Sequence, residues 1–173
     1  MKLIKISKKQ NTTKKGLGYF EIYEKYFEEI RYNKLKILEI GIENGGSIRT
    51  WKRYFPKSKI IGLDIKKMNF NIKNVDLIQG DQSSSEILNK IIKKYKSFDI
   101  VIDDGSHLTK HVIKSFKYLF KALKNDGLYI IEDLQTSYFP RYGGSRINLR
   151  KRSTSLNFFK DLTDSINYEK NDK

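Results

Sequence analysis

The 173-residue sequence contains no cysteine, only two prolines and a single alanine, Ala122. The absence of cysteine excludes disulfide bonds and thiolate metal sites, and it favours a reducing compartment such as the cytoplasm. No apolar run approaches the ~18 residues needed to span a bilayer, and the first residues lack the apolar core of a signal peptide. We therefore expect a cytoplasmic protein without membrane insertion.

Basic residues are abundant, with 35 Lys and Arg against 20 Asp and Glu, so the net charge is +15. Such a charge ordinarily indicates a nucleic acid or an anionic surface as partner. The lysines are spread along the chain, however, and the abundance of Lys, Ile and Asn matches the codon bias of an AT-rich genome. The densest basic run, residues 146–152, is interpreted as a solvated loop in preference to a phosphate-binding patch. Nucleic acid is therefore the less favoured partner.

The length and the 38% apolar content predict one globular domain with a real core. Residues 1–17 are polar and are predicted to form a flexible N-terminal segment, while residues 18–173 form the single domain. From Gly18 to Tyr32 the aromatic residues recur at helical spacing. We interpret this spacing as a leading helix whose aromatic stripe faces the core.

Short apolar runs alternate with amphipathic segments over the rest of the chain. Strands are predicted at residues 36–40, 59–64, 75–79, 98–103 and 128–132. Helices are predicted at residues 46–54, 85–95, 109–124 and 153–167, with a loop over 134–152. This alternation predicts an α/β fold with a doubly wound, mainly parallel sheet.

A glycine-rich turn follows the first predicted strand, in the pattern Glu39-x-Gly41-x-x-x-Gly45-Gly46. A strand, a glycine turn and a helix start together seat a nucleotide-like ligand at the carboxyl end of a sheet, because glycine lets the backbone approach the ligand. The pattern departs from Gly-x-Gly-x-x-Gly, so it is a poor dinucleotide fingerprint. The alternative is a purely structural strand-turn-helix.

Polar residues also end the second and third predicted strands. Asp64 lies 25 residues after Glu39, where a carboxylate can accept hydrogen bonds from ribose hydroxyls. Its alternative role is to begin a turn. Asp81 and Gln82 follow the third strand and could contact an adenine edge, with helix capping as an equal competitor.

Acidic residues follow the fourth and fifth predicted strands, in Asp103-Asp104-Gly105-Ser106-His107 and in Glu132-Asp133. Both strand ends face the ligand crevice of a doubly wound sheet, so Asp104, Glu132 and Asp133 should converge. Clustered carboxylates repel unless they are protonated, hydrogen-bonded or bridged by a cation, and oxygen ligands suit Mg²⁺. His107 at the mouth of the crevice is a natural general base. The alternative is a simple turn with His107 on the surface.

Together these motifs resemble the class I S-adenosylmethionine (SAM)-dependent methyltransferases. The likeness is greatest to the metal-dependent sugar O-methyltransferases of macrolide biosynthesis, the mycinamicin type, with their cephalosporin-hydroxylase-like relatives, and it runs from about residue 18 to 144. The motifs that carry the resemblance are Leu38-Glu-Ile-Gly41, Gly62-x-Asp64, Gly80-Asp-Gln-Ser83, Ile102-Asp-Asp-Gly-Ser-His107 and Ile131-Glu-Asp-Leu134.

The resemblance implies transfer of a methyl group from SAM to a hydroxyl of a sugar or glycosylated small molecule, with Mg²⁺ and with His107 as the catalytic base. The implied cofactor-binding residues are Glu39, Gly41, Gly45, Asp64, Asp81, Gln82 and Asp103. The implied metal ligands are Asp104, Glu132 and Asp133. The implied substrate residues are Tyr138, Tyr142 and Gly143.

The sequence departs from the class in one respect, because the class has seven strands and only five are predicted here. The resemblance then implies a domain that lacks the last two strands, and three explanations stay open: truncation at the C-terminus, a split gene product or a minimal variant. Two alternative functions stay open at this point: methylation of RNA or another polyanion, and a SAM-binding module without activity. Formation of a homo-oligomer also stays open.

Overall fold

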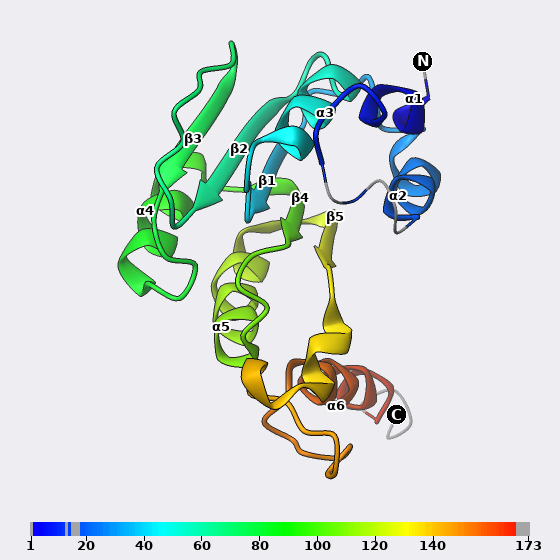
Figure 1. The fold of residues 1–173 in the computed structure, drawn as a ribbon, viewed down its shortest axis with the longest axis vertical. Helices are drawn as coiled ribbons and strands as arrows, with labels where there is room; N and C mark the ends of the chain where they lie inside the picture. The colour runs from blue at the N-terminus through cyan, green and yellow to red at the C-terminus, as the bar shows by residue number, and fades with distance from the viewer. Residues whose placement is uncertain (1, 13, 15–17, 169–173) are drawn as a thin grey trace.

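The computed structural model describes residues 2–12, 14 and 18–168, and these form a parallel sheet between two layers of helices (Figure 1). Its strands are β1 (Lys36–Ile40), β2 (Lys59–Asp64), β3 (Val75–Gln79), β4 (Phe98–Asp103) and β5 (Leu123–Ile131). They lie in the order β3-β2-β1-β4-β5, and every neighbouring pair is parallel. The predicted doubly wound α/β fold is confirmed.

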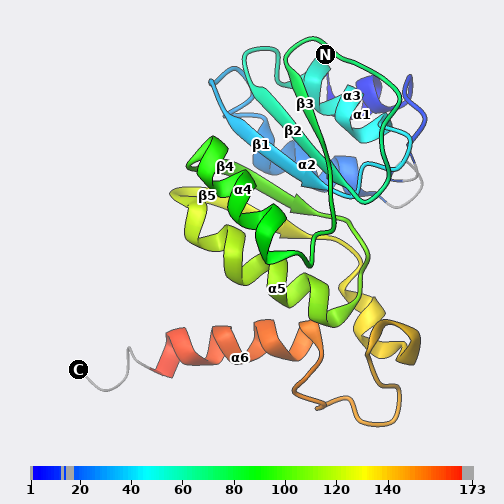
Figure 2. The ribbon, with the colours of Figure 1, turned by 90° about the vertical axis from the view of Figure 1, so that its left-hand side faces the viewer.

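Helices cover both faces of the sheet (Figure 2). One face packs against α1 (Leu3–Ser7), α2 (Tyr19–Phe27) and α3 (Gly46–Tyr54), and the other against α4 (Ser85–Tyr95) and α5 (Thr109–Leu119). Successive residues of β1 point to opposite faces, so Ile37 belongs to the first core cluster and Leu38 to the second. Because helices cover both faces, the central strands are buried on both sides, and this burial explains why their sequences are short apolar runs.

The N-terminal segment differs from the expectation of a flexible, polar tail at the residues that the structure describes. Leu3 and Ile6 of α1 are fully buried against α2 and α3. The Leu3 amide donates to Glu24 Oε1 at 2.8 Å, and Lys14 is only 3% exposed. The overall polarity of this segment conceals two apolar residues that are three apart and therefore share a helix face.

The boundary between α5 and β5 also differs from the prediction. The helix predicted to run to residue 124 ends at Leu119, a 3₁₀ turn covers Phe120–Ala122, and β5 begins at Leu123. The Asn125-Asp-Gly127 sequence, which is typical of a helix end, lies inside the strand, where a register shift between Phe98 and Ile100 of β4 accommodates it. Phe120, which lies within the helix range expected from the sequence, is 51% exposed.

The chain after β5 forms 3₁₀ turns at Leu134–Tyr138 and Pro140–Tyr142 and then α6 (Ser155–Tyr168). Helix α6 lies against α5 (Figure 2), where Phe116 meets Phe159 edge-to-face at 4.9 Å. The described residues contain no strand after β5, in agreement with the five predicted strands. Among the helices that the structure describes, none combines the length and the apolar character that crossing a membrane requires.

Candidate active site

The carboxyl ends of β1 and β4 form the centre of the candidate site. From β1 the chain continues outward through β2 and β3 on one side, and it then returns to form β4 and β5 on the other side of β1. Open α/β sheets bind ligands at such a switch point. Gly41 follows β1 with φ +83°, and a Cβ there would overlap the backbone carbonyl of Asp104 after β4. Only glycine therefore lets the two loops approach so closely.

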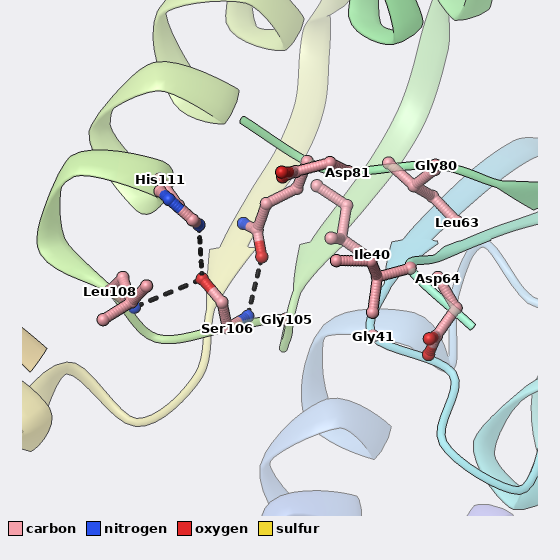
Figure 3. Close-up of a pocket in the computed structure, with 12 residues that line it drawn as sticks. Ile40, Gly41, Leu63, Asp64, Gly80, Asp81, Gly105, Ser106, Leu108 and His111 are labelled. Carbon is pink, nitrogen blue, oxygen red and sulfur yellow. Dashed lines mark hydrogen bonds between the residues drawn. The ribbon is translucent and has the colours of Figure 1, made fainter. Parts of the chain in front are cut away.

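A cavity of about 320 Å³ opens on one side of this switch point (Figure 3). Gly41 and Asp64 lie at one end, and Ser106 and His111 lie at the other. The Ser106 amide donates to Gln82 Oε1 at 2.6 Å, and the Ser106 hydroxyl lies 3.0 Å from His111 Nδ1. A largely apolar cavity with a few fixed polar groups at its ends suits a small nucleoside-like ligand. We call it the nucleoside cavity.

Four predicted cofactor residues line the nucleoside cavity: Gly41, Asp64, Asp81 and Gln82. Backbone amides fix the Asp64 carboxylate, since Oδ2 accepts from Ile42 at 2.8 Å and Oδ1 accepts from Lys66 at 2.8 Å. Asp81 Oδ1 accepts from the Ser83 amide at 2.7 Å. Asp81 therefore stabilises a turn and also lines the cavity, while Ser84 caps α4.

The other three predicted cofactor residues are not among those that line the nucleoside cavity. Asp103 is 1% exposed and accepts from Ser115 Oγ at 2.5 Å and Gln82 Nε2 at 3.0 Å, so it supports Gln82 from behind. Burial raises the pKa of Asp103 to about 6. Gly45 has φ +78° and faces the Phe70 ring.

Glu39 is fully buried behind Gly41. Its Oε2 accepts from Ser47 Oγ at 2.8 Å, and its Oε1 lies 3.7 Å from Lys14 Nζ. Burial raises the pKa of Glu39 to about 7, although Lys14 and Ser47 oppose this effect. The acidic residue of the glycine turn therefore lies in the interior between the glycine loop and the N-terminal segment.

A second cavity of about 560 Å³ adjoins the first and shares Gly41, Asp64 and Gly105 with it. Asp104, His107 and Asp133 also line it, and one ligand atom from each of the three lies within 4.8 Å of the others. His107 Nε2 is 3.9 Å from Asp104 Oδ1 and 3.8 Å from Asp133 Oδ2. We call this the acidic cavity.

Strained backbone is concentrated around the acidic cavity. Among the described residues, five other than glycine have positive φ, and three of them line this cavity: Glu43 (51°), His107 (57°) and Asp133 (56°). Left-handed backbone is unfavourable for residues with a Cβ, and its retention is typical of functional sites. The strain turns the His107 and Asp133 side chains toward the same space.

Glu132, the third predicted metal ligand, is outside this three-residue group. It is 4% exposed, and its Oε1 accepts from Lys14 Nζ at 2.7 Å and from the Tyr23 hydroxyl at 2.5 Å. Lys14 also forms an ion pair with Asp104. Burial lowers the pKa of Lys14, but Glu39, Glu132 and Asp104 outweigh burial and raise it above its usual range.

Sequence reasoning missed Lys14, Tyr19 and Tyr23 as site residues. Tyr23 belongs to the aromatic stripe that the spacing placed in the core, and it is indeed 3% exposed there, whereas Tyr19 precedes that stripe. Their hydroxyls nevertheless reach carboxylates more than a hundred residues later in the chain. Helical spacing indicates which face of a helix is buried, but it does not show whether the hydroxyl group of a tyrosine on that face reaches a polar site.

The predicted substrate residues lie after β5. The Tyr142 ring meets the His107 ring edge-to-face at 6.2 Å. Tyr142 and Gly143 line a further hollow of about 280 Å³ beside Leu108 and His111. Tyr138 is 37% exposed and does not line any of these three hollows. The structure thus brings one predicted substrate residue against His107.

A parallel sheet in the order β3-β2-β1-β4-β5, with a nucleoside-sized cavity at its switch point, is a Rossmann-like fold. Residues 1–137 match the FtsJ-like methyltransferase family. Because this match covers more than half of the chain, the protein belongs to the FtsJ-like methyltransferase family.

Curated relatives include several sugar O-methyltransferases. The chain is 41% identical over 155 residues to mycinamicin VI 2''-O-methyltransferase of Micromonospora griseorubida, and this match covers 85% of this chain and 39% of that protein. It is 40% identical over 155 residues to demethylmacrocin O-methyltransferase of Streptomyces fradiae, with 85% and 39% covered. The chain thus spans about two fifths of the length of these relatives.

A solved structure agrees with the fold. The MycE methyltransferase from the mycinamycin biosynthetic pathway, in complex with Mg, SAH and mycinamycin VI, superposes with a TM-score of 0.92 at 38% identity. The match covers 96% of this chain and 48% of that one. This likeness confirms the predicted methyltransferase fold.

Proposed function

We propose that this chain is a SAM-dependent O-methyltransferase domain that acts on a hydroxyl of a sugar or a glycosylated small molecule with the help of Mg²⁺. The observation that carries the proposal is the shared wall of the two cavities, because Gly41, Asp64 and Gly105 line both. A cofactor in one cavity and an acceptor in the other would therefore be adjacent. The curated relatives include a mycinamicin VI 2''-O-methyltransferase and a demethylmacrocin O-methyltransferase, and their activities support the same class of acceptor.

The nucleoside cavity fits the adenosine part of SAM, which supplies an electrophilic methyl group when bound. Asp64 Oδ1 can accept a hydrogen bond from a ribose hydroxyl, because it retains a lone pair beside its Lys66 amide partner, whereas Oδ2 already accepts from the Ile42 and Glu43 amides. Gln82 is held by Asp103 and Ser106, so its orientation is fixed before a ligand arrives. Such prior order lowers the entropic cost of binding.

The acidic cavity fits Mg²⁺, because carboxylate oxygens of Asp104 and Asp133 lie within 4.8 Å of one another and this ion prefers oxygen ligands. We propose Asp104 and Asp133 as ligands of the ion, and Glu132, the third carboxylate predicted from the sequence, stays a proposed ligand. A bound Mg²⁺ would lower the pKa of the acceptor hydroxyl. His107 Nε2 is placed to take the hydroxyl proton, and the two carboxylates within 4 Å would stabilise the resulting imidazolium.

Calorimetric titration of the folded chain with SAM, with and without Mg²⁺, tests this proposal. We expect micromolar binding of SAM, and loss of most of that affinity in Asp64→Ala because its carboxylate would bind the ribose. Glu43→Ala, which changes a residue of the acidic cavity only, is the matched control. A folded protein that takes up no SAM in either condition would contradict the proposed function.

A further inference from the structure

Two side chains from the start of the chain, Lys14 and Tyr19, together hold one oxygen of each of the three predicted metal ligands. Lys14 Nζ contacts Asp104 Oδ2, and it also donates to Glu132 Oε1 at 2.7 Å. The Tyr19 hydroxyl donates to Asp133 Oδ1 at 2.6 Å. These residues form a layer of donors behind the carboxylates, on the side away from His107.

The opposite oxygens of two of these carboxylates face the acidic cavity. Asp104 Oδ1 lies 3.9 Å from His107 Nε2, while Asp104 Oδ2 is the atom that Lys14 contacts. Because a carboxylate is rigid and planar, holding one of its oxygens also fixes the direction of the other. Lys14 therefore aims the second oxygen of Asp104 into the cavity.

Burial makes this contact strong. Lys14 is 3% exposed, so little water competes for its ammonium group. Asp104 and Glu132 end neighbouring strands and repel one another when both are charged. The ammonium group lies between them and offsets that repulsion, which an exposed ion pair would do only weakly.

We propose that Lys14 is a positioning residue for the cation site, which orients Asp104 toward His107 and Asp133 and keeps Asp104 and Glu132 together. This inference rests on the proposed function, because it concerns the same cation. It goes beyond that function by giving a residue of the N-terminal segment a role at the cation site. The rival view is that the Lys14 ammonium occupies the place of the cation and competes with it, and this view predicts the opposite effect of removing Lys14.

The test measures the affinity of the full chain for Mn²⁺. Electron paramagnetic resonance reports the concentration of free Mn²⁺ during the titration, and competition with Mg²⁺ shows whether the two ions share one site. Lys14→Met removes the charge and keeps much of the side-chain volume. We expect its dissociation constant for Mn²⁺ to rise about 10- to 100-fold, the usual effect of removing a partner of a metal ligand. Lys59→Met makes the same chemical change at a more exposed ion pair with Asp76, remote from the cavity, and should leave Mn²⁺ affinity unchanged.

A second measurement uses the unaltered chain, in case Lys14→Met fails to fold. Lysines are acetylated with a succinimidyl ester, with and without Mn²⁺, and modification of Lys14 is followed by mass spectrometry relative to the half-exposed Lys59. We expect Lys14 to stay protected in both conditions. Labelling of Lys14 on addition of Mn²⁺ would overturn the inference in favour of competition.

The remaining outcomes separate the inference from the proposed function. Tighter or unchanged Mn²⁺ binding by folded Lys14→Met would overturn the positioning role while leaving the methyltransferase proposal intact. Binding of SAM without any Mn²⁺ binding by the unaltered chain would overturn both the cation site and the role of Lys14. Failure to bind either ligand would overturn the proposed function itself.

Discussion

Two histidines four residues apart serve different cavities. His107 lines the acidic cavity between two carboxylates, whereas His111 lines the nucleoside cavity and contacts Ser106. The sequence shows only their separation. The structure assigns them to different parts of the site, because the backbone turns sharply at His107 before α5 begins.

We predict that His107→Ala lowers the turnover number for methyl transfer by about 10²- to 10⁴-fold, the usual contribution of a general base. SAM affinity should change little, because His107 is absent from the nucleoside cavity. Steady-state kinetics together with calorimetry of SAM measure the two effects. His111→Ala is the control, and its main effect should be on SAM affinity. Unchanged turnover in His107→Ala would remove this residue from the mechanism.

Asp103 carries a prediction about pH. Its pKa is raised to about 6 in the folded state from an ordinary value of 3.8, because burial disfavours the charged form. The folded state therefore binds the proton more tightly than the unfolded state, so this group loses its stabilising effect as pH rises from about 4 to 6. Asparagine resembles the protonated acid at every pH.

The free energy of unfolding of Asp103→Asn, relative to the unaltered chain, should accordingly increase by up to about 3 kcal/mol between pH 4 and pH 7. Urea denaturation at several pH values measures this difference. The exposed residue Asp126, changed to Asn, is the matched control. A relative stability of Asp103→Asn that does not vary with pH would contradict the raised pKa.

Asp64, Asp104, His107 and Asp133 were predicted from the sequence and do line the two cavities, because strand ends in a parallel sheet meet at one edge. Sequence reasoning assigned Asp103 to the cofactor, whereas the structure places that side chain in the interior. Alternation along β4 explains the difference, since adjacent residues at a strand end point in opposite directions. A motif alone does not show which aspartate of such a pair faces the ligand.

At the scale of elements, the loops after β1 and β4 depend on their mutual approach at Gly41. We predict that Gly41→Ala abolishes measurable SAM binding and destabilises the fold by more than about 2 kcal/mol, because the methyl group overlaps Asp104 and φ is positive. Gly18→Ala has a similar φ of +71° and no neighbour within 4 Å, so it measures the backbone strain alone. Calorimetry and thermal denaturation compare the two variants. Equal effects would show that overlap is unimportant.

The predicted and observed strand boundaries agree where turns carry clear signals and disagree at β5. Strands β1 to β4 begin and end at the predicted residues. At β5 the Asn-Asp-Gly sequence is a strong local signal for the end of a helix. Pairing with β4 overrides it, because the register shift lets the strand continue through these residues. Tertiary pairing of this kind is not encoded in local propensity.

At the scale of the whole molecule, the doubly wound parallel sheet and a ligand site at its carboxyl edge could be predicted from the alternation of strands and helices, whereas the order of the strands came from the structure. The contribution of the N-terminal residues to the site could not be predicted in this way. Lys14 and Glu132 are 118 positions apart, and no periodic pattern links them. The contact exists only because α1 and α2 pack on the face of the sheet that ends beside Asp104.

That long separation has a kinetic and thermodynamic consequence. The residues that line the nucleoside cavity lie between Ile40 and His111 in the sequence, whereas the hydrogen-bonding groups around the acidic cavity come from both ends of the fold. Closing so large a loop is entropically costly, so this cluster should be among the last features to form and the first to open. By linkage, a cation that binds there selects molecules in which the N-terminal helices are docked. Hydrogen exchange in α1 should therefore slow when the cation binds, although no cation ligand lies in that helix.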